Sequence, residues 1–432
     1  MVDRIIVVGG GAAGLMAAGR AAELGGNVLL LEKQAKTGLK LGITGKGRCN
    51  LTNASSISDH LAHLGPQGAF MRNAYARYFA PDTIAFFEAH GVPTVTERGQ
   101  RVFPASQRAH DVVDALRAYC LEHQVQFRYH SPVQALRVSA GAITGVCLPE
   151  RDLDAATVIL ATGGMSYPRT GSTGDGYRLA ADVGHTVIPP RPGLVPLVLQ
   201  EPEVPRLEGL SLRNVRASLY REDDLLASEF GEMLFTSDGV SGPIILTLSM
   251  VAAHALSQAP LRLLLDLKPA IEPVELDQRL QRDLASLGNA RFSALLKGLL
   301  PRLLIDVFAE RSGLSPDHRL SQLSAEQRRR VLSLLKAFPF TVVGTRPIGE
   351  AIITQGGVST VEINPATMAS RRIAGLYFAG EIIDVAGDTG GYNLQLAFTT
   401  GYLAGESAAR AVRAAHSADA MQASPSAEGS EQ

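Results

Sequence analysis

The chain has 432 residues, of which 46% are hydrophobic and 19% charged, a balance that excludes disorder as its main state. Its 41 basic and 42 acidic side chains give a net charge of −1, so no overall field attracts nucleic acid or anionic lipid. The three cysteines are too few and too scattered for a disulfide framework or a zinc site, which indicates a reducing, cytoplasmic setting.

The N-terminal apolar stretch, residues 5–19, is the only candidate targeting segment. It lacks a basic flank, contains three consecutive glycines and is shorter than the ~20 residues of a membrane span. The ten histidines show no paired-ligand spacing. We therefore expect a soluble protein without a signal peptide, membrane contact or metal site.

The first 32 residues predict a strand, a glycine turn, a helix and a second strand. Residues 5–8 form the apolar strand, Gly9-x-Gly11-x-x-Gly14 the turn, and Glu32 follows the apolar strand 28–31. In a dinucleotide-binding motif, the glycines allow a tight turn, close approach of a pyrophosphate and close helix packing, and the acid binds ribose hydroxyls. The spacing therefore predicts a bound dinucleotide, without deciding between NAD and FAD.

The remaining segments predict an α/β protein with inserts. Helices are expected near residues 81–90 and 110–123, and strands near 126–138, 143–148 and 157–161. Alternating apolar and polar residues after position 190 indicate antiparallel strands, and residues 272–336 are helical in pattern. We expect a discontinuous nucleotide-binding domain (1–190 and 340–412), a β-barrel-like insert (191–271), a helical insert (272–339) and a disordered tail (413–432).

A second glycine turn follows a late apolar strand, in GLYFAGEIIDVAGDTGGYNLQLAFTTG. Here Gly380 and Glu381 end a strand, and a helix opens near Asn393. A helix N-terminus aimed at the N1–C2=O edge of a flavin would stabilise the reduced anionic ring. An ordinary strand–turn–helix of the same sheet is the alternative interpretation.

Several ordered segments give the chain a family resemblance: GGGAAGLMAA, LLLEK, TGKGRCNLTN, GQRVFPAS, ILATGGMSYPRTGSTGDGYRLA, GEMLFTSDGVSGP, TVVGTRPIGEAIITQGGV and GLYFAGEIIDVAGDTGGYNLQLAF. Together, over roughly residues 4–406, they resemble the bacterial BaiN-like (HI0933-like) FAD flavoproteins. The resemblance implies a glutathione-reductase-type Rossmann FAD domain with inserted β-barrel and helical subdomains.

The resemblance also implies which residues contact FAD. The segment from Gly9 to Gly14 would hold the pyrophosphate, Glu32 the adenosine ribose, and the backbone of Val133 the adenine. Further residues would lie along the cofactor or around its flavin ring. The full expected set is Gly9, Gly11, Ala12, Ala13, Gly14, Glu32, Lys33, Lys40, Thr44, Gly45, Gly47, Arg48, Asn50, Val133, Thr162, Gly163, Gly380, Glu381, Gly391, Asn393 and Leu394.

Three positions depart from the family pattern. Many relatives have His where Ser237 stands, Trp where Leu396 stands and an acid where Ala386 stands. The FAD assignment does not depend on these positions. Substrate chemistry does not carry over from the family, because such side chains could line the pocket.

Five residues are candidates for the chemistry itself. Cys49, between Arg48 and Asn50, would serve as an acid or nucleophile if its pKa were depressed, and an inert packed thiol is the alternative. Asp388 and Tyr392 flank the late glycine turn and either could donate a proton, although Asp-Gly turn chemistry competes for Asp388. Tyr167 and Arg169 follow a strand end, where open α/β sheets present ligands, and are candidate substrate contacts.

These observations predict an FAD-dependent oxidoreductase that transfers hydride between flavin N5 and an activated C=C or C=N bond of a small molecule. NAD(P)H would be a transient electron donor, since no second GxGxxG motif is present in the insert. One alternative is reduction of uridine to dihydrouridine in ribosomal RNA. Residues 291–336, with nine basic and four acidic side chains, would then bind RNA. The others are an amine oxidase using O2 and a protein that holds FAD structurally.

Overall fold

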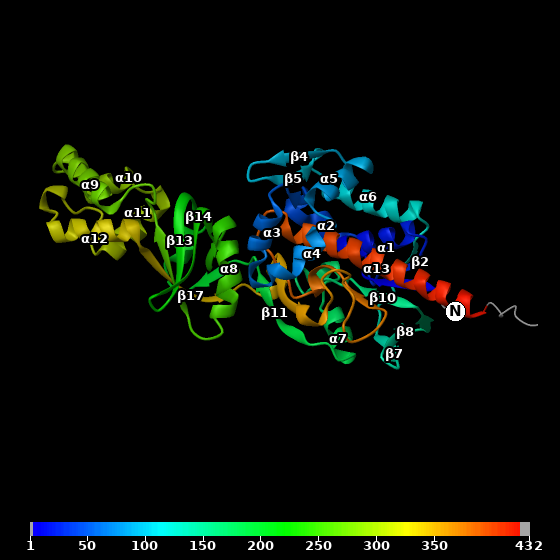
Figure 1. Ribbon diagram of the computed structural model, residues 1–432. Coiled ribbons are helices and arrows are strands. Elements are labelled where there is room, and N and C mark those ends of the chain that lie inside the picture. Colours follow the sequence, from blue (N-terminus) through cyan, green and yellow to red (C-terminus); the bar gives the residue numbers. More distant parts are fainter. Residues whose placement is uncertain (1–2, 424–432) are drawn as a thin grey trace, which may run out of the picture. The chain divides into compact units, whose positions relative to one another are not determined.

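The computed structural model describes residues 3–423, which divide into two compact units. Unit 1 comprises the residues up to 191 and from 353 onward, and unit 2 comprises residues 192–352 (Figure 1). Each unit has its own hydrophobic core. The parallel sheet of unit 1 and the closed barrel and helices of unit 2 confirm the predicted α/β class with inserts.

Unit 1 is built on a five-stranded parallel sheet. Its order is β19 (Leu376–Phe378), β10 (Thr157–Leu160), β1 (Arg4–Val8), β2 (Asn27–Leu31) and β6 (Gln126–Arg128). The apolar strands β1 and β10 are almost completely buried, as expected for a parallel sheet covered on both faces. Because all five strands run the same way, segments that follow them gather at one carboxyl edge.

Three helices pack closely together in unit 1. Helix α1 (Ala12–Glu23) lies between α6 (Ala109–Glu122) and α13 (Tyr392–Ala423), and Figure 1 shows α1 and α13 side by side. A Cβ at Gly401 or Gly405 of α13 would lie 2.4 or 2.3 Å from a backbone oxygen of α1, and one at Gly19 would lie 2.3 Å from the Tyr119 ring. Glycine therefore sets the spacing between these helices.

Shorter elements complete unit 1. Its remaining helices are α2 (Leu39–Ile43), α3 (Ile57–His63), α4 (Arg72–Tyr75), α5 (Ala80–Ala89) and α7 (Asp175–Asp182). An antiparallel sheet joins β3 (Thr52–Asn53), β5 (Arg101–Pro104) and β4 (Thr94–Glu97), and another joins β7 (Ala135–Ser139), β8 (Ala142–Cys147) and β9 (Asp152–Asp154). Strand β18 (Ile353–Val358) pairs with β11 (Val187–Gly193).

Unit 2 contains a closed six-stranded barrel and its helices. The strand order is β12 (Leu197–Leu199), β15 (Gly239–Ser241), β14 (Asp224–Phe235), β13 (Ser211–Arg221), β16 (Leu261–Asp266) and β17 (Phe338–Thr345). The helices are α8 (Pro243–Ala255), α9 (Pro273–Leu287), α10 (Phe292–Lys297), α11 (Arg302–Ser312) and α12 (Ala325–Lys336). Barrel and helices share one core.

Two predicted boundaries differ from the structure. The expected end of the insert at residue 339 falls inside β17, which closes the barrel by pairing with β12 and β16. A disordered tail was expected from residue 413, but α13 continues as a helix to Ala423, because the Ala-rich sequence favours helix. Residues 424–432 of that expected tail lie outside the described residues.

In the described part of the chain, no helix combines the length and apolar character needed to cross a membrane.

Candidate functional site

The first glycine turn leaves β1 and opens helix α1. Gly9 has a φ of 102°, and a Cβ at Gly14 would lie 1.9 Å from the Gly9 carbonyl oxygen, so the fold itself requires glycine at both positions. Gly11 is different, because a Cβ there meets no atom within 4 Å. Gly11 is also the N-cap of α1 and supplies no capping side chain. The first turn of α1, which includes Ala12 and Ala13, has backbone N–H groups without an intrahelical acceptor. Open space therefore lies in front of these N–H groups.

Glu32 follows β2 at the same edge of the sheet and is buried. Its Oε2 accepts a hydrogen bond from Gly10 N at 2.7 Å, and its Oε1 accepts one from Gln34 N at 2.8 Å. Each carboxylate oxygen can accept a further hydrogen bond, as a ribose diol would require. Val133, far from Glu32 in the sequence, is also buried. Two positions before it, the N–H of Ser131 donates to the Glu32 carbonyl oxygen.

The two predicted cofactor lysines are both paired with carboxylates. Lys33 Nζ contacts Thr173 Oγ1 and lies 2.5 Å from Asp175 Oδ2. Lys40 Nζ donates to Ser166 Oγ at 2.6 Å and to Glu381 Oε2 at 2.7 Å. Their ammonium charges are thus largely compensated within the protein, which the motif alone does not indicate.

The loop from Thr44 to Asn50 is held by its own contacts. Thr44 Oγ1 donates to the Leu41 carbonyl oxygen, and Gly45 and Gly47 have φ values of 57° and 84°. The Arg48 guanidinium binds Glu97 and Gln107 and lies 4.2 Å from the centre of the Phe103 ring.

Cys49 and Asn50, in the same loop, are placed differently from each other. The Cys49 side chain is fully buried, and burial raises the pKa of its thiol to about 12. Of the two interpretations of Cys49, this burial speaks against a thiol with a depressed pKa and fits the inert packed thiol. The buried Asn50 Oδ1 has no hydrogen-bond partner among residues 3–423, so it can accept one from a ligand.

The turns after β10 and β19 carry the next group of expected contacts. Thr162 Oγ1 is buried and also lacks a partner in the described chain. Gly163 has a φ of 73°, and a Cβ at Gly380 would lie 2.8 Å from the Ala13 Cβ. The turn that follows β19 at Gly380 therefore lies against the first turn of α1, so this turn and the first glycine turn meet at one edge of the sheet.

The start of α13 holds the remaining candidates. Asn393 ties the preceding turn by accepting from Gly387 N at 2.8 Å and donating to the Gly387 carbonyl oxygen at 2.7 Å. A Cβ at Gly391 would lie 2.4 Å from the backbone of Thr52. Leu394 is partly buried in the first turn of α13. Gly391 and Asn393 thus fix the shape of this turn.

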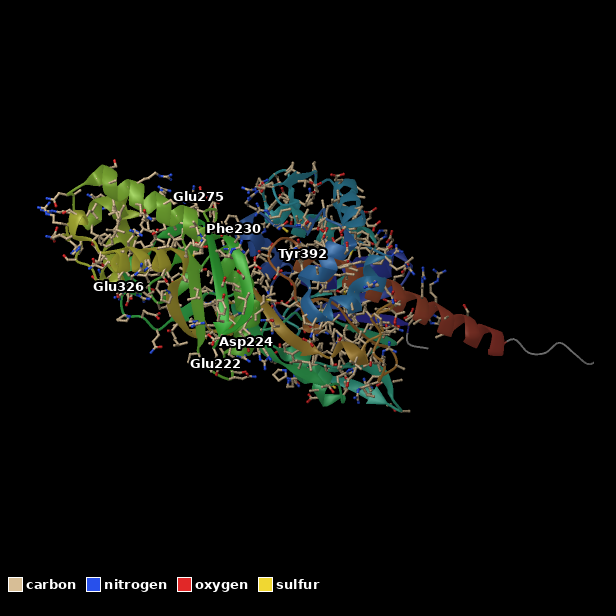
Figure 2. All side chains as sticks on the ribbon, turned by 60° about the vertical axis from the view of Figure 1, so that its left-hand side comes forward. Glu222, Asp224, Phe230, Glu275, Glu326 and Tyr392 are labelled. Atoms are coloured by element: carbon tan, nitrogen blue, oxygen red, sulfur yellow. The ribbon has the colours of Figure 1, made fainter. Side chains whose placement is uncertain are left out.

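Asp388 and Tyr392 both contact His63, a residue that the sequence did not single out. Asp388 Oδ2 lies 2.8 Å from His63 Nδ1, and the His63 and Tyr392 rings stack with centres 4.3 Å apart. Burial raises the pKa of the Tyr392 hydroxyl, so it keeps its proton near neutral pH. Tyr392 is labelled in Figure 2. The structure brings these two candidates together, and it places Asp388 in a contact that anchors the turn to α3.

Tyr167 and Arg169 have exposed side chains beside the short helical turn 168–170. Tyr167 has a φ of 53° and is 37% exposed.

The residues that sequence reasoning missed are His63, Thr354, Asp175 and Glu97. No local motif marks them, since each partners a residue at least 49 positions away. Within residues 3–423, no group of three or more His, Cys, Asp or Glu side chains is arranged to hold a metal ion.

Residues 3–407 match the family described as HI0933-like protein Rossmann domain. The chain belongs to this family. Within it, the chain is 34% identical over 412 residues to the 3-dehydro-bile acid delta(4,6)-reductase of Clostridium scindens, covering 94% of this chain and 99% of the relative. It is also 32% identical over 409 residues to the ribosomal RNA dihydrouridine synthase of Escherichia coli, covering 92% and 96%.

Among solved structures, this HI0933-like chain is similar to 3-ketosteroid delta1-dehydrogenase from Sterolibacterium denitrificans. The TM-score is 0.50 at 15% identity, with 95% of this chain and 100% of the other covered, and this likeness concerns the fold. The family and its curated members confirm the predicted class, and the chain is an FAD-dependent oxidoreductase. Its substrate and electron donor are a separate question.

Proposed function

We propose that the chain binds FAD along the carboxyl edge of the unit 1 sheet and reduces an activated C=C bond of a small molecule. The observation that carries the proposal is the contrast among the glycines of the first turn. Gly9 and Gly14 are required by the fold, whereas Gly11 faces open space at a helix N-terminus. The protein itself leaves room for a side chain at position 11, so the glycine there is explained by a ligand that needs the space. A pyrophosphate that approaches the backbone closely is such a ligand.

Other side chains at this edge fit the same cofactor. Glu32 has acceptor capacity left for ribose hydroxyls, and the unpartnered Thr162 Oγ1 and Asn50 Oδ1 can each hydrogen-bond a polar group. The N-terminus of the long helix α13 favours negative charge on a nearby ring. When bound, FAD supplies a two-electron carrier that exchanges hydride with a substrate.

The protein's own residues would then polarise the substrate and supply a proton. Tyr392 is protonated near neutral pH and adjoins the late glycine turn, which makes it the preferred proton donor of our candidates. Asp388 would act through His63 and the turn, as a positioning residue. Tyr167 and Arg169 are proposed as exposed substrate contacts, and NAD(P)H as the transient reductant.

Reduction of a conjugated C=C bond is the chemistry that the names of both curated relatives imply, one for a bile acid and one for a uridine. Their identities to this chain, 34% and 32%, are too similar to choose between the two substrates. In the RNA alternative, the basic segment 291–336 would bind phosphates. Several of its cations are already paired, as in Arg328 with Asp277, Arg311 with Glu203 and Lys336 with Asp266. This pairing of part of the basic segment supports the small-molecule proposal.

The cofactor site is tested by Gly11→Val, with Gly344→Val as the matched control. Both glycines have open space for a Cβ and neither requires a positive φ. We expect Gly11→Val to fold and melt like the unliganded wild type but to lose FAD in reconstitution, because its side chain would occupy the pyrophosphate position. Gly344→Val should retain FAD. Wild-type FAD occupancy in Gly11→Val would contradict the proposed site.

The reaction is tested by anaerobic mixing of the flavoprotein with NADH or NADPH while the flavin absorbance is followed. The reduced protein is then offered an enone steroid or a uridine-containing RNA, and in a separate arm the oxidised protein is mixed with amines and then exposed to O2. Rapid reoxidation by the enone alone supports the small-molecule proposal. Reoxidation by RNA alone, weakened by salt, would replace it with the RNA alternative. Flavin reduction by amines followed by reoxidation with O2 would indicate the oxidase alternative.

A further inference from the structure

Strand β18 contributes one side chain that joins the two turns at the carboxyl edge of the unit 1 sheet. Thr354 is 1% exposed, and its Oγ1 accepts hydrogen bonds from Met165 N at 2.8 Å and from Ser166 N at 3.2 Å. Its own N–H donates to Glu381 Oε1 at 2.7 Å. One residue thus fastens the segment after β10 to the carboxylate that follows β19.

The Glu381 carboxylate is oriented by these contacts from several segments. Its Oε1 also receives the Ser166 hydroxyl at 3.3 Å, and its Oε2 receives Lys40 Nζ at 2.7 Å. The Glu381 side chain is 21% exposed, and its Oε2, with Lys40 as its partner, can accept a second hydrogen bond. A carboxylate held in one orientation loses less conformational freedom when it binds a hydroxyl group than a mobile one.

The turn after β10 lies very close to the side chains of Thr354 and Glu381. A Cβ at Gly164 would lie 2.3 Å from Thr354 Oγ1 and 3.2 Å from the Glu381 Cδ. Gly164 has no positive φ, so the close approach to Thr354, and not backbone conformation, restricts this position to glycine. The hydroxyl of Thr354 therefore determines how closely the turn after β10 approaches Glu381.

We infer that Thr354 is a positioning residue for FAD, which holds Glu381 and the Gly163–Ser166 segment in the arrangement that binds the cofactor. This inference rests on the proposed function. Replacing the hydroxyl with a methyl group leaves the backbone N–H groups of Met165 and Ser166 without their acceptor, which disfavours the observed turn. A purely structural role would predict lower stability without a matching loss of cofactor affinity.

The test compares the dissociation constant for FAD of the full-length apoprotein, from quenching of FAD fluorescence, across four variants. We expect Thr354→Val to raise it about tenfold, because the arrangement loses about one net hydrogen bond. Thr354→Ser keeps the hydroxyl and should stay within about twofold of the wild type. Gly164→Ala disturbs the same contact from the other side and should weaken FAD binding as well.

Thr157→Val is the control, since Thr157 begins β10 at the opposite edge of the sheet and its buried Oγ1 has no partner in the described residues. It should leave FAD affinity unchanged. Unchanged affinity in Thr354→Val, or failure of serine to restore it, would overturn the inference. If Thr354→Val does not fold, Gly164→Ala decides, and a wild-type affinity there would overturn it. A wild type that binds no FAD would instead contradict the proposed function itself.

Discussion

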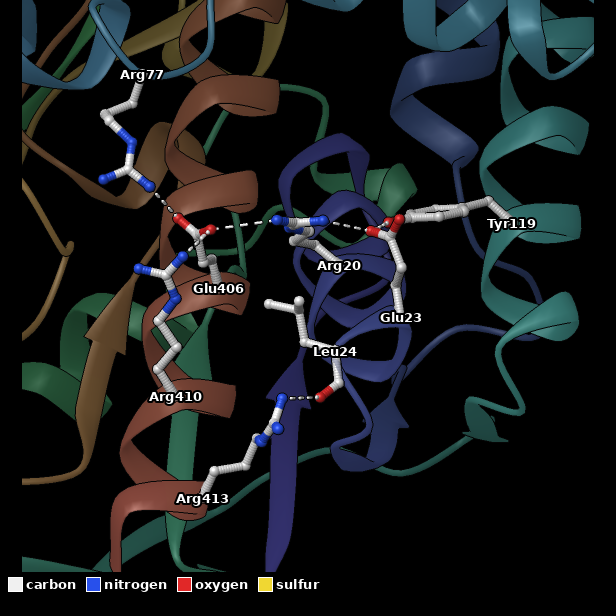
Figure 3. A network of polar contacts seen from close by, with 8 residues as sticks. All are labelled: Arg20, Glu23, Leu24, Arg77, Tyr119, Glu406, Arg410 and Arg413. Carbon is white, nitrogen blue, oxygen red and sulfur yellow. Dashed lines mark hydrogen bonds and ion pairs between the residues drawn. The ribbon is translucent and has the colours of Figure 1, made fainter.

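Two glutamates of unit 1, the buried Glu406 and the partly exposed Glu381, show how the same side chain serves different purposes. Glu406, on α13, accepts from Arg20 at 3.1 Å, Arg77 at 2.7 Å and Arg410 at 2.8 Å, and it is 7% exposed (Figure 3). Glu381, at the carboxyl edge of the sheet, has one cationic partner, Lys40, and is 21% exposed. The first carboxylate is surrounded by three guanidinium groups, whereas the side chain of the second has one cationic partner and more contact with solvent.

The difference indicates which cluster serves stability and which serves binding. Around Glu406, Arg20 also pairs with Glu23 at 2.7 Å, and Glu23 accepts the Tyr119 hydroxyl at 2.7 Å, so the network joins α1, α6 and α13 (Figure 3). Such a network has no obvious place for a ligand. Both carboxylate oxygens of Glu381 accept from protein donors, but Oε2, which accepts from Lys40, keeps acceptor capacity for a ligand hydroxyl.

The largest expected effect is the loss of stability on Glu406→Gln. It leaves the half-buried Arg20 without one of its two carboxylates, and breaking a buried pair costs about 3 kcal/mol. We expect that loss in the free energy of unfolding, measured by urea denaturation, with FAD affinity unchanged. Glu310→Gln, which removes the exposed pair with Arg206, should cost far less. An equal loss in both variants would remove the distinction between the two clusters.

Glu381→Gln should show the reverse pattern. The variant loses the charge that Lys40 and the ligand hydroxyl share, so we expect the dissociation constant for FAD to rise about tenfold or more, as for a hydrogen bond to a charged group. The melting temperature of the apoprotein should change little, since Lys40 keeps partial access to water. Isothermal titration calorimetry and thermal scans of the same samples measure both quantities. A large loss of apoprotein stability with unchanged affinity would contradict the binding role.

A third, smaller effect concerns acid sensitivity. His185 has a fully buried side chain, and its ring nitrogens lie 3.1 Å from Glu362 Oε2 and 2.9 Å from Ser370 Oγ. Burial lowers the pKa of His185 despite the nearby Glu362. The native state therefore binds fewer protons than the unfolded state just below about pH 6.5, and stability falls as the pH decreases through that range.

We expect His185→Gln to reduce this slope, which is at most about 1.4 kcal/mol per pH unit for one proton. His60, whose pKa burial also lowers, keeps its share of the slope in the variant. Glu362 does not contribute to the slope in this pH range. Burial raises its pKa, but hydrogen bonds from Thr186 and Arg372 outweigh burial and lower the pKa to about 2, so the carboxylate stays charged in the native state. Urea denaturation from neutral to mildly acidic pH measures the effect, and the exposed His416→Gln is the control. A wild-type slope in His185→Gln would exclude His185 as its source.

The smallest expected effect is at Cys49. Its buried thiol, with a pKa of about 12, should resist alkylation by iodoacetamide in the native protein and react after unfolding. The partly exposed Cys147 should be the thiol that reacts first. Mass spectrometry of the alkylated wild type and of Cys147→Ser checks this assignment. Cys49→Ala should retain FAD. Rapid native-state labelling of Cys49 would restore it as a candidate catalytic group.

Much of the fold could be predicted because its signals are local. The apolar strands, the glycine spacing from Gly9 to Gly14 and the helix beginning near Asn393 each lie within a short stretch of sequence. The boundary near residue 340 was misplaced because the last barrel strand, β17, follows the helices and closes the barrel only through partners far away in the chain.

The sequence by itself determined the parallel sheet and the dinucleotide turn, because hydrophobic period and glycine spacing act over a few residues. The class of enzyme followed from the resemblance of its ordered segments to the HI0933-like family. Only the tertiary structure decided the partners of the charged side chains. Lys33 pairs with Asp175, and Lys40 with Glu381 across 341 positions, and neither pairing leaves a local signal. Burial likewise decided that the Cys49 thiol keeps its proton, since desolvation depends on every segment packed around it.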